Sequence, residues 1–218
     1  MNSNSIEPSP SGGTRQRILD AAISVIRKKG YTATTVDDLC AKAGVTKGAF
    51  FYYFSTKDSM AIAAAEHWSE MSDALFTTAP YNRFDDPLNR VLGYLDFRKA
   101  LLRGAVAEFT CLVGTMVQEV YSTHPDIRRV CEASISDQAD RLEADIADAM
   151  TRYRVRASWT AKSLALHAHA VLQGAFILAK AKGDGVAAGA SVDHLRRYIE
   201  LLFGRPGAKI RQKPKRKI

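Results

Sequence analysis

The sequence predicts an all-α protein with a small three-helix domain near the N-terminus and a larger helical domain behind it. Composition is the first reason, because long stretches are rich in Ala, Leu, Arg, Glu and Asp and only 7 prolines interrupt 218 residues. Periodicity is the second reason, since apolar residues recur three and four positions apart and no stretch alternates as a strand does. About nine helices are expected, which is enough to bury a sizeable core.

The first helix is expected from about Thr14 to Lys29, where Gly30 ends it. Its apolar stripe consists of Ile18, Ala22, Val25 and Ile26. The basic run 27–29 stands at the C-terminal end, where positive charge is favourable to the helix dipole. A DNA contact is the alternative role for this run.

Residues 34–57 predict two short helices joined by a tight turn. Thr35 is a good N-cap for the first, and Gly44 supplies the left-handed residue that ends it. Thr46 then caps a second helix, and Phe50 and Phe54 of that helix are expected in the core of the small domain. Its apolar partners on the first helix are Val36, Leu39, Cys40 and Ala43. This is the arrangement of a helix-turn-helix, whose second helix enters the DNA major groove.

The later helices follow from caps and breaks. A helix from about 57 to 76 leaves the small domain and is the natural lever between the two domains. Pro80 lies in a loop, and further helices are expected at about 86–102, 106–121, 125–150, 158–182 and, capped by Ser191, up to 203. The expected division is an arm (1–13), a DNA-binding head (14–60), a second helical domain (61–204) and a basic tail (205–218).

Charge is unevenly distributed along the chain. Residues 14–60 hold eight Lys/Arg and four Asp, and the tail holds seven Lys/Arg and no acid, whereas residues 61–204 hold 16 basic and 18 acidic residues. This asymmetry is expected when DNA meets one end of a molecule. The tail either adds non-specific phosphate affinity or is solvated without a role, and the second is favoured.

The segment GVTKGAFFYYFSTK (44–57), with RILDAA (17–22) upstream, resembles the signature of the tetracycline-repressor (TetR/AcrR) family of bacterial transcription regulators. About 45 residues match in order and spacing. Two positions depart from the pattern: Phe51 stands where the family usually has tyrosine, and Tyr53 where histidine is common. The resemblance implies a homodimer that docks on a palindromic double-stranded DNA operator.

The resemblance also implies a role for each position of the head. Thr35 and Thr46 would offer hydroxyls and helix N-termini to phosphates, and Lys47 would reach a guanine edge. Gly48 would let the backbone approach the DNA closely, and Ala49 would touch a thymine methyl group. Tyr52, Tyr53 and Lys57 would be directed at phosphates, and Phe51 would lie half in the core.

In this family the second domain usually holds a small-molecule pocket and pairs with a second copy through its last two helices. Candidate pocket residues are His67, Phe109, Cys111, Met116, His167 and Gln173, and a core role is the alternative for each. Cys111 is a candidate for addition to electrophiles such as quinones, although an inert buried thiol is the simpler interpretation. Dimerisation is expected through the helices at 158–182 and 191–203, because the first is apolar around much of its circumference.

Other function classes are disfavoured. No nucleophile elbow, phosphate loop, dinucleotide fingerprint or HExxH motif is present, so no enzyme, catalytic residue or cofactor is expected. His167 and His169 are two residues apart on one helix and point apart, so no metal is expected either. The sequence shows no export signal and no uncharged apolar run of 18 residues, so we expect a cytoplasmic protein without membrane spans. The three cysteines are then expected to be reduced. The expected function is a ligand-released repressor, and an activator or DNA binder without ligand response is the alternative.

Overall fold

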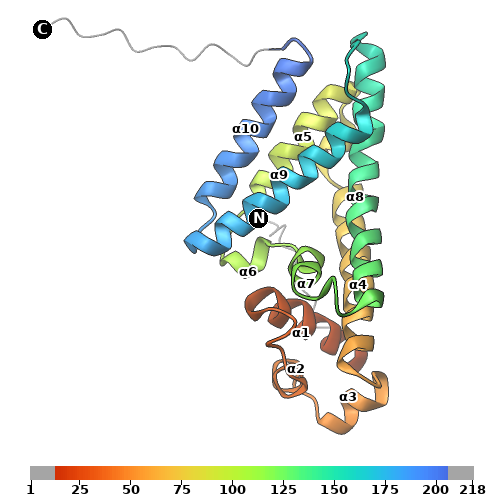
Figure 1. Cartoon of the computed structure of the whole chain (residues 1–218), viewed down its shortest axis with the longest axis vertical. Coiled ribbons are helices and arrows are strands. Elements are labelled where there is room, and N and C mark those ends of the chain that lie inside the picture. The colour runs from red at the N-terminus through yellow and green to blue at the C-terminus, as the bar shows by residue number, and fades with distance from the viewer. Residues whose placement is uncertain (1–12, 206–218) are drawn as a thin grey trace, which may run out of the picture.

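The computed structural model describes residues 13–205, which form ten α-helices and one 3₁₀ helix (Figure 1). The elements are α1 (Thr14–Lys29), α2 (Val36–Ala43), α3 (Lys47–Tyr53), α4 (Lys57–Thr77), η1 (Pro80–Arg83), α5 (Pro87–Ala100), α6 (Val106–Phe109), α7 (Leu112–Val120), α8 (Pro125–Arg152), α9 (Ala161–Lys182) and α10 (Val186–Leu202). The all-α prediction is confirmed, and the described part contains no strand. The predicted arm and basic tail lie outside the described residues, apart from Gly13 and Arg205.

Helices α1–α3 form the head at one end of an elongated molecule, and α4 runs from the head into the body beside α8 (Figure 1). Helices α5 and α9 pack on α8, and α10 packs on α9 and α5 to complete the body. One end of α4 contributes Met60 and Ala64 to the core of the head, and the other end contributes Phe76 to the core of the body. Helix α4 therefore contributes to both cores, as the predicted link between the head and the body requires.

The head and the body share apolar packing. The core cluster that contains Ile18 and Phe50 of the head also contains Leu112 and Met116 of α7 and Ile127 of α8. All five side chains are at most 1% exposed. Because α1 packs directly on α6 and α7, a movement of these short helices reaches the head without passing through α4.

Local sequence signals explain the helix ends in the head. The Thr35 hydroxyl accepts from the Asp38 N–H while the Asp38 carboxylate accepts from the Thr35 N–H, a complete capping box. Gly44 is left-handed with φ of 64°, as predicted for the residue that ends α2. The Thr46 hydroxyl accepts from Ala49 N–H at 3.1 Å and so starts α3.

The helix predicted over 106–121 is broken in two. In an unbroken helix the Thr110 carbonyl would accept from Gly114 N–H. Instead it accepts from Arg27 Nε of α1 at 2.7 Å, and Gly114 N–H faces Cys111 Sγ at 3.4 Å. Thr110 is therefore extended between α6 and α7, which is why the structure has one α-helix more than expected.

The last helix begins earlier than predicted. The sequence predicts a Gly/Ala linker before Ser191, but α10 starts at Val186, whose N–H is held by Asp184 Oδ1 at 2.8 Å. Ala188 packs on Ala175 and Ala179 of α9, so these small residues allow the two helices to approach closely. Helix α9 is long and apolar enough to cross a membrane by length and composition, but many of its residues are buried between α8 and α10.

Candidate functional site

Helix α3 presents three aromatic side chains to solvent. Phe51, Tyr52 and Tyr53 are 52%, 82% and 41% exposed, whereas Phe50 and Phe54 are buried as predicted. Phe51 packs edge-on against Phe50 at 5.3 Å between ring centres, but much of each of the three rings remains in water, so this short helix is a candidate partner surface. The phenolic hydroxyls of Tyr52 and Tyr53 are suited to hydrogen bonds with phosphate oxygens.

The first turn of α3 is also open. Lys47 is exposed, and its ammonium group pairs with Asp37 of α2 at 2.8 Å. The Asp37 carboxylate raises the pKa of Lys47 further above its ordinary value of 10.5, and the side chain is a cation at neutral pH with or without this partner. A DNA contact by Lys47 requires that it leave Asp37, an exchange that costs little at an exposed site.

Gly48 has no packing reason to be glycine. A Cβ atom there would meet only the Thr46 hydroxyl, at 3.8 Å, and glycine inside a helix costs roughly 1 kcal/mol relative to alanine. The missing side chain leaves the backbone of α3 open to close approach by another molecule. Ala49 is half-buried beside it, and the exposed Thr35 lies at the N-terminus of α2.

Lys57 has intramolecular partners that its sequence position does not indicate. Its ammonium group donates to the backbone carbonyls of Tyr31 at 3.2 Å and Thr34 at 3.1 Å. It also lies 4.3 Å from the centre of the Tyr31 ring. Lys57 therefore holds the loop between α1 and α2 against the start of α4, in addition to any phosphate contact.

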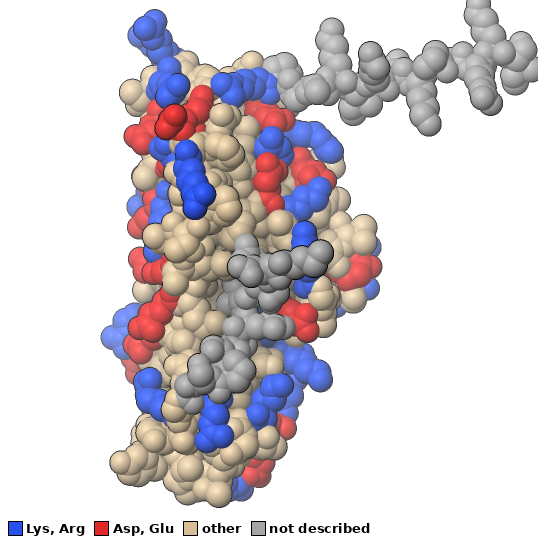
Figure 2. Space-filling model, turned by 180° about the vertical axis from the view of Figure 1, so that it is seen from behind, with Lys and Arg blue, Asp and Glu red and all other residues tan. Residues whose placement is uncertain are grey.

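Basic side chains lie beside the head on one face of the molecule. On the face that Figure 2 shows, Lys and Arg side chains cross the lower part, while the lower left corner, where α3 lies, is mostly uncharged. A short exposed helix flanked by cations has the shape and charge that suit a groove bordered by two phosphate strands.

Two of the six predicted pocket residues line one cavity of about 190 Å³ between α7 and α9. They are Cys111 and Gln173, and Lys180 and Glu119 line the same cavity. Phe109 and Met116 belong to the adjacent apolar core rather than to the cavity wall.

The two histidines of that set lie elsewhere. His67 pairs with Asp20 between α4 and α1, and His167 stacks on Tyr198 of α10. Within residues 13–205, no group of three His, Cys, Asp or Glu side chains is placed to hold a metal ion.

Cys111 has cationic neighbours that its own segment does not reveal. Arg27 of α1 donates to the carbonyl of the preceding residue, Thr110, and Lys180 of α9 lines the same cavity as Cys111. Burial lowers the pKa of Arg27 to about 10 and also lowers that of Lys180. Sγ itself stands at the N-terminus of α7, facing Gly114 N–H. Burial raises the pKa of the Cys131 thiol to about 12, which disfavours the reactive thiolate of Cys131 at neutral pH.

The Cys111 cavity is joined to the head by two contacts. Glu119 of α7 accepts from the N–H groups of Tyr31 at 3.2 Å and Thr32 at 2.8 Å. Gly30 has φ of +88°, and a Cβ there would lie 2.3 Å from the Glu119 carboxylate, so only glycine fits under it. The second contact is the bond from Arg27 to the Thr110 carbonyl. Both Glu119 and Thr110 also line the cavity.

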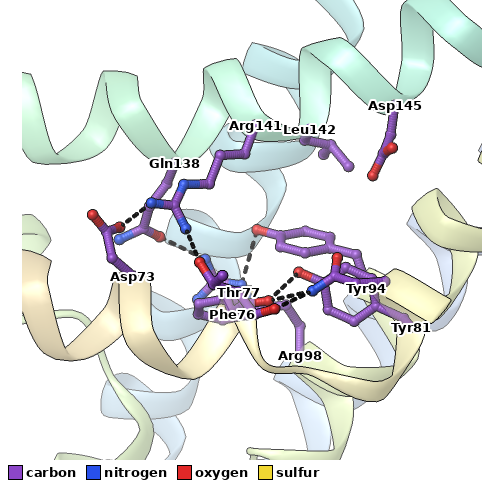
Figure 3. Close-up of a pocket in the computed structure, with 11 residues that line it drawn as sticks. Asp73, Phe76, Thr77, Tyr81, Tyr94, Arg98, Gln138, Arg141, Leu142 and Asp145 are labelled. Atoms are coloured by element: carbon purple, nitrogen blue, oxygen red, sulfur yellow. Dashed lines mark hydrogen bonds and ion pairs between the residues drawn. The ribbon is translucent and has the colours of Figure 1, made fainter.

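A larger cavity of about 290 Å³ lies between α4, η1, α5 and α8 (Figure 3). No residue predicted for the ligand site lines it, because its walls come from segments as far apart as Asp73 and Asp145. Phe76, Tyr81 and Tyr94 form its aromatic wall, and Arg98 lies among them. The sequence does carry a signal for this cavity: aromatic residues and arginines concentrate on α5 and in the loop before it.

Helices α9 and α10 expose several large apolar side chains. The residues are Leu166, Ile177, Leu178, Val186, Tyr198 and Leu201. In a single copy this surface is in contact with water, as the predicted dimerisation through these two helices requires.

Comparisons with known proteins agree with this geometry. Residues 18–64 match the model of bacterial regulatory proteins of the tetR family, and residues 87–195 match the model of a tetracyclin repressor-like C-terminal domain. An uncharacterized HTH-type regulator from the lacX 3' region of Lactococcus lactis is 26% identical over 192 residues, 87% of this chain and 94% of that protein. The HTH-type transcriptional repressor KstR2 of Rhodococcus jostii is 25% identical over 158 residues, 64% of this chain and 74% of that protein.

The fold also matches solved structures. A TetR family regulator from Agrobacterium tumefaciens superposes with a TM-score of 0.76 at 19% identity, over 85% of this chain and 96% of that one. The two family models together cover both the head and the body. The chain therefore belongs to the TetR family and is a DNA-binding transcriptional regulator rather than an enzyme.

Proposed function

We propose that this regulator is an intracellular repressor that binds a palindromic DNA operator as a homodimer. Each subunit would place the N-terminus of α3 in a major groove, with half-sites about one helical turn or somewhat more apart. The observation that carries the proposal is the open first turn of α3, where Lys47 and Gly48 are exposed and Gly48 has no packing reason to be glycine. Repression is favoured over activation by the relative KstR2, which is named a repressor.

The DNA contacts divide into two classes. Lys47 and Ala49 would read base edges, whereas Tyr52, Tyr53, Lys57 and the helix N-termini at Thr35 and Thr46 would hold phosphates. Phe51 lacks a hydroxyl, so it would contribute only apolar contact with the sugar or with a thymine methyl group. Pairing of the two subunits would use the exposed apolar surface of α9 and α10.

We further propose that a small electrophile acts as the inducer by reacting at Cys111. An enone or quinone would form a carbon–sulfur bond to Sγ, its π electrons would move to the carbonyl oxygen, and the thiol proton would end there. Lys180, which lines the same cavity, and Arg27, which binds the neighbouring Thr110 carbonyl, would stabilise the negative charge that develops on that oxygen.

An adduct at Cys111 would act on the head through its neighbours. The cavity of about 190 Å³ is bordered by Thr110 and Glu119, which hold the end of α1 and the loop after it. Displacement of either residue would favour a spacing of the two heads that no longer fits the operator. Helix α4 offers a parallel route.

The experiment is fluorescence anisotropy with DNA from the upstream intergenic region and a scrambled duplex as control. Sequence-selective binding that an added quinone or enal reverses would support the repressor, and loss of the response in Cys111→Ser would support the thiol. Equal binding to both duplexes with a steep salt dependence would reduce the protein to a non-specific binder. Selective binding that no compound reverses would leave the activator or ligand-independent alternative, and an intact response in Cys111→Ser would overturn the thiol mechanism.

A further inference from the structure

We propose that the cavity between α4, η1, α5 and α8 is a second effector site, which binds a small planar aromatic carboxylate through Arg98. This site is separate from the Cys111 cavity and does not depend on the thiol mechanism. The volume of about 290 Å³ lies just below the roughly 300 Å³ at which the range for small-molecule pockets begins. A one- or two-ring molecule is the matching size.

Arg98 is the cation of this cavity that has no carboxylate partner. The neighbouring charges are all paired: Arg141 binds Asp73 at 2.7 Å, and Asp145 binds Arg90 at 2.6 Å. Within residues 13–205, no carboxylate forms an ion pair with the Arg98 guanidinium. Its partners there are neutral, the Tyr94 hydroxyl at 2.9 Å from Nε and Gln138 Oε1 at 2.6 Å from Nη2.

Arg98 is half-buried, which gives weight to its having no carboxylate partner in the part of the chain that the structure describes. A guanidinium removed from water is stabilised most by a carboxylate, which forms bonds about twice as strong as those to neutral acceptors. Nη1 donates to no acceptor among the described residues, so one edge of the guanidinium remains available. Figure 3 shows Arg98 below α8, linked to Tyr94 and Gln138, while Asp145 stands apart from it.

The walls of the cavity select the rest of the ligand. The guanidinium lies 4.1 Å from the ring centre of Phe76 and 5.2 Å from that of Tyr94. Tyr81 stands edge-on to Tyr94 at 5.9 Å between ring centres, which completes an aromatic surface. Rings of this kind favour a flat apolar body by edge-to-face and offset contacts.

An aromatic cation fits the site less well. Asp73 and Asp145 would have to leave Arg141 and Arg90 to receive it, and an additional cation beside Arg98 is repelled. Burial raises the pKa of Tyr81 to about 12, so its hydroxyl stays a hydrogen-bond donor at neutral pH and does not supply negative charge. The arrangement therefore favours an anion.

Gln138 permits a sharp test of this inference. Gln138→Glu keeps the size of the side chain and places a carboxylate at the atom that now accepts from Arg98, so the protein supplies its own anion. Arg98→Gln removes the cation instead. Arg83→Gln is the matched control, because Arg83 is exposed on η1 and has no hydrogen-bond or ion-pair partner among the described residues.

The probes are 1-naphthoate, its neutral amide and 1-naphthylmethylammonium, titrated into the full-length protein by isothermal calorimetry. We expect naphthoate to bind wild type and Arg83→Gln equally, and Gln138→Glu and Arg98→Gln about tenfold or more weakly. The amide should bind wild type about tenfold more weakly than naphthoate, and the ammonium compound more weakly still. Circular dichroism will show whether each variant is folded. If Arg98→Gln does not fold, Gln138→Glu still tests the site.

A second readout locates the bound anion. Burial and the charge of Arg98 lower the pKa of His169, whose ring also lies near the Gln173 side chain. Naphthoate at Arg98 should raise that pKa in NMR titrations of wild type. No heat with naphthoate in wild type, equal affinity of the amide, preference for the ammonium compound, or unchanged affinity in folded Gln138→Glu would each overturn the assignment.

Discussion

Glu119 provides the most direct test of how the body controls the head. Its carboxylate accepts from the N–H groups of Tyr31 and Thr32, at 3.2 and 2.8 Å. Hydrogen bonds to charged groups contribute roughly 1.5–3 kcal/mol each, but Glu119 and Thr32 are exposed and water competes for both. We therefore assign about 1 kcal/mol to each bond, and about 2 kcal/mol to the pair.

Glu119→Ala removes both bonds and Glu119→Gln leaves one acceptor oxygen. We expect a loss of about 2 kcal/mol of stability for the first and about 1 kcal/mol for the second, which lowers Tm by roughly 4–8 °C and 2–4 °C. If these bonds carry the signal from the Cys111 cavity, the ratio of operator Kd with and without electrophile should fall by up to about thirtyfold in Glu119→Ala.

The assays are thermal unfolding by circular dichroism and operator anisotropy with and without a quinone. Glu66→Ala is the matched control, because Glu66 is an exposed carboxylate of α4 without a partner among the described residues. A Glu119→Ala protein with wild-type Tm and a wild-type induction ratio would refute the reasoning. A lowered Tm with a wild-type ratio would confine Glu119 to a structural role.

Three further predictions concern the head and the pH dependence of stability. Lys47→Ala should relax the base preference at one operator position by about 1–3 kcal/mol, and unaltered selectivity in this variant would exclude α3 as the reading helix. Asp37→Asn frees Lys47 and removes a negative charge, so it should tighten binding to every duplex. Lys57→Ala should weaken binding to all duplexes alike and reduce the slope of log affinity against log salt concentration by about one. Lower stability of the protein with an unchanged slope would limit Lys57 to its structural bonds with the Tyr31 and Thr34 carbonyls. His169 has a pKa of about 4 in the folded protein, against its ordinary value of 6.5, so the unfolded state binds more protons between these values. This contribution to stability should therefore be fully present above about pH 6.5 and fall by about 3 kcal/mol as the pH drops to about 4. Urea titrations across this pH range should show that the stability of His169→Gln depends less on pH than that of wild type. Parallel pH dependences of the two proteins would contradict the lowered pKa of His169.

The sequence alone determined the elements whose signals are local. Thr35, Gly44 and Thr46 define the ends of α2 and α3 because a cap acts on backbone groups within three or four residues. The burial of Phe50 and Phe54 likewise follows from helical spacing. For the same reason the helix-turn-helix, and with it the resemblance to the family, follows from the order of residues in one short segment.

Tertiary structure decided what depends on residues far apart in the chain. Arg27 breaks the helix predicted over 106–121 because a buried guanidinium needs an acceptor, and the Thr110 carbonyl is the one it reaches. The same packing brings Arg27 and Lys180 to Cys111, which no pattern near residue 111 indicates. Among the described residues that line the larger cavity, Arg98 is the cation without a carboxylate partner because α8 places Gln138 against it, and only the packing of α5 on α8 determines this.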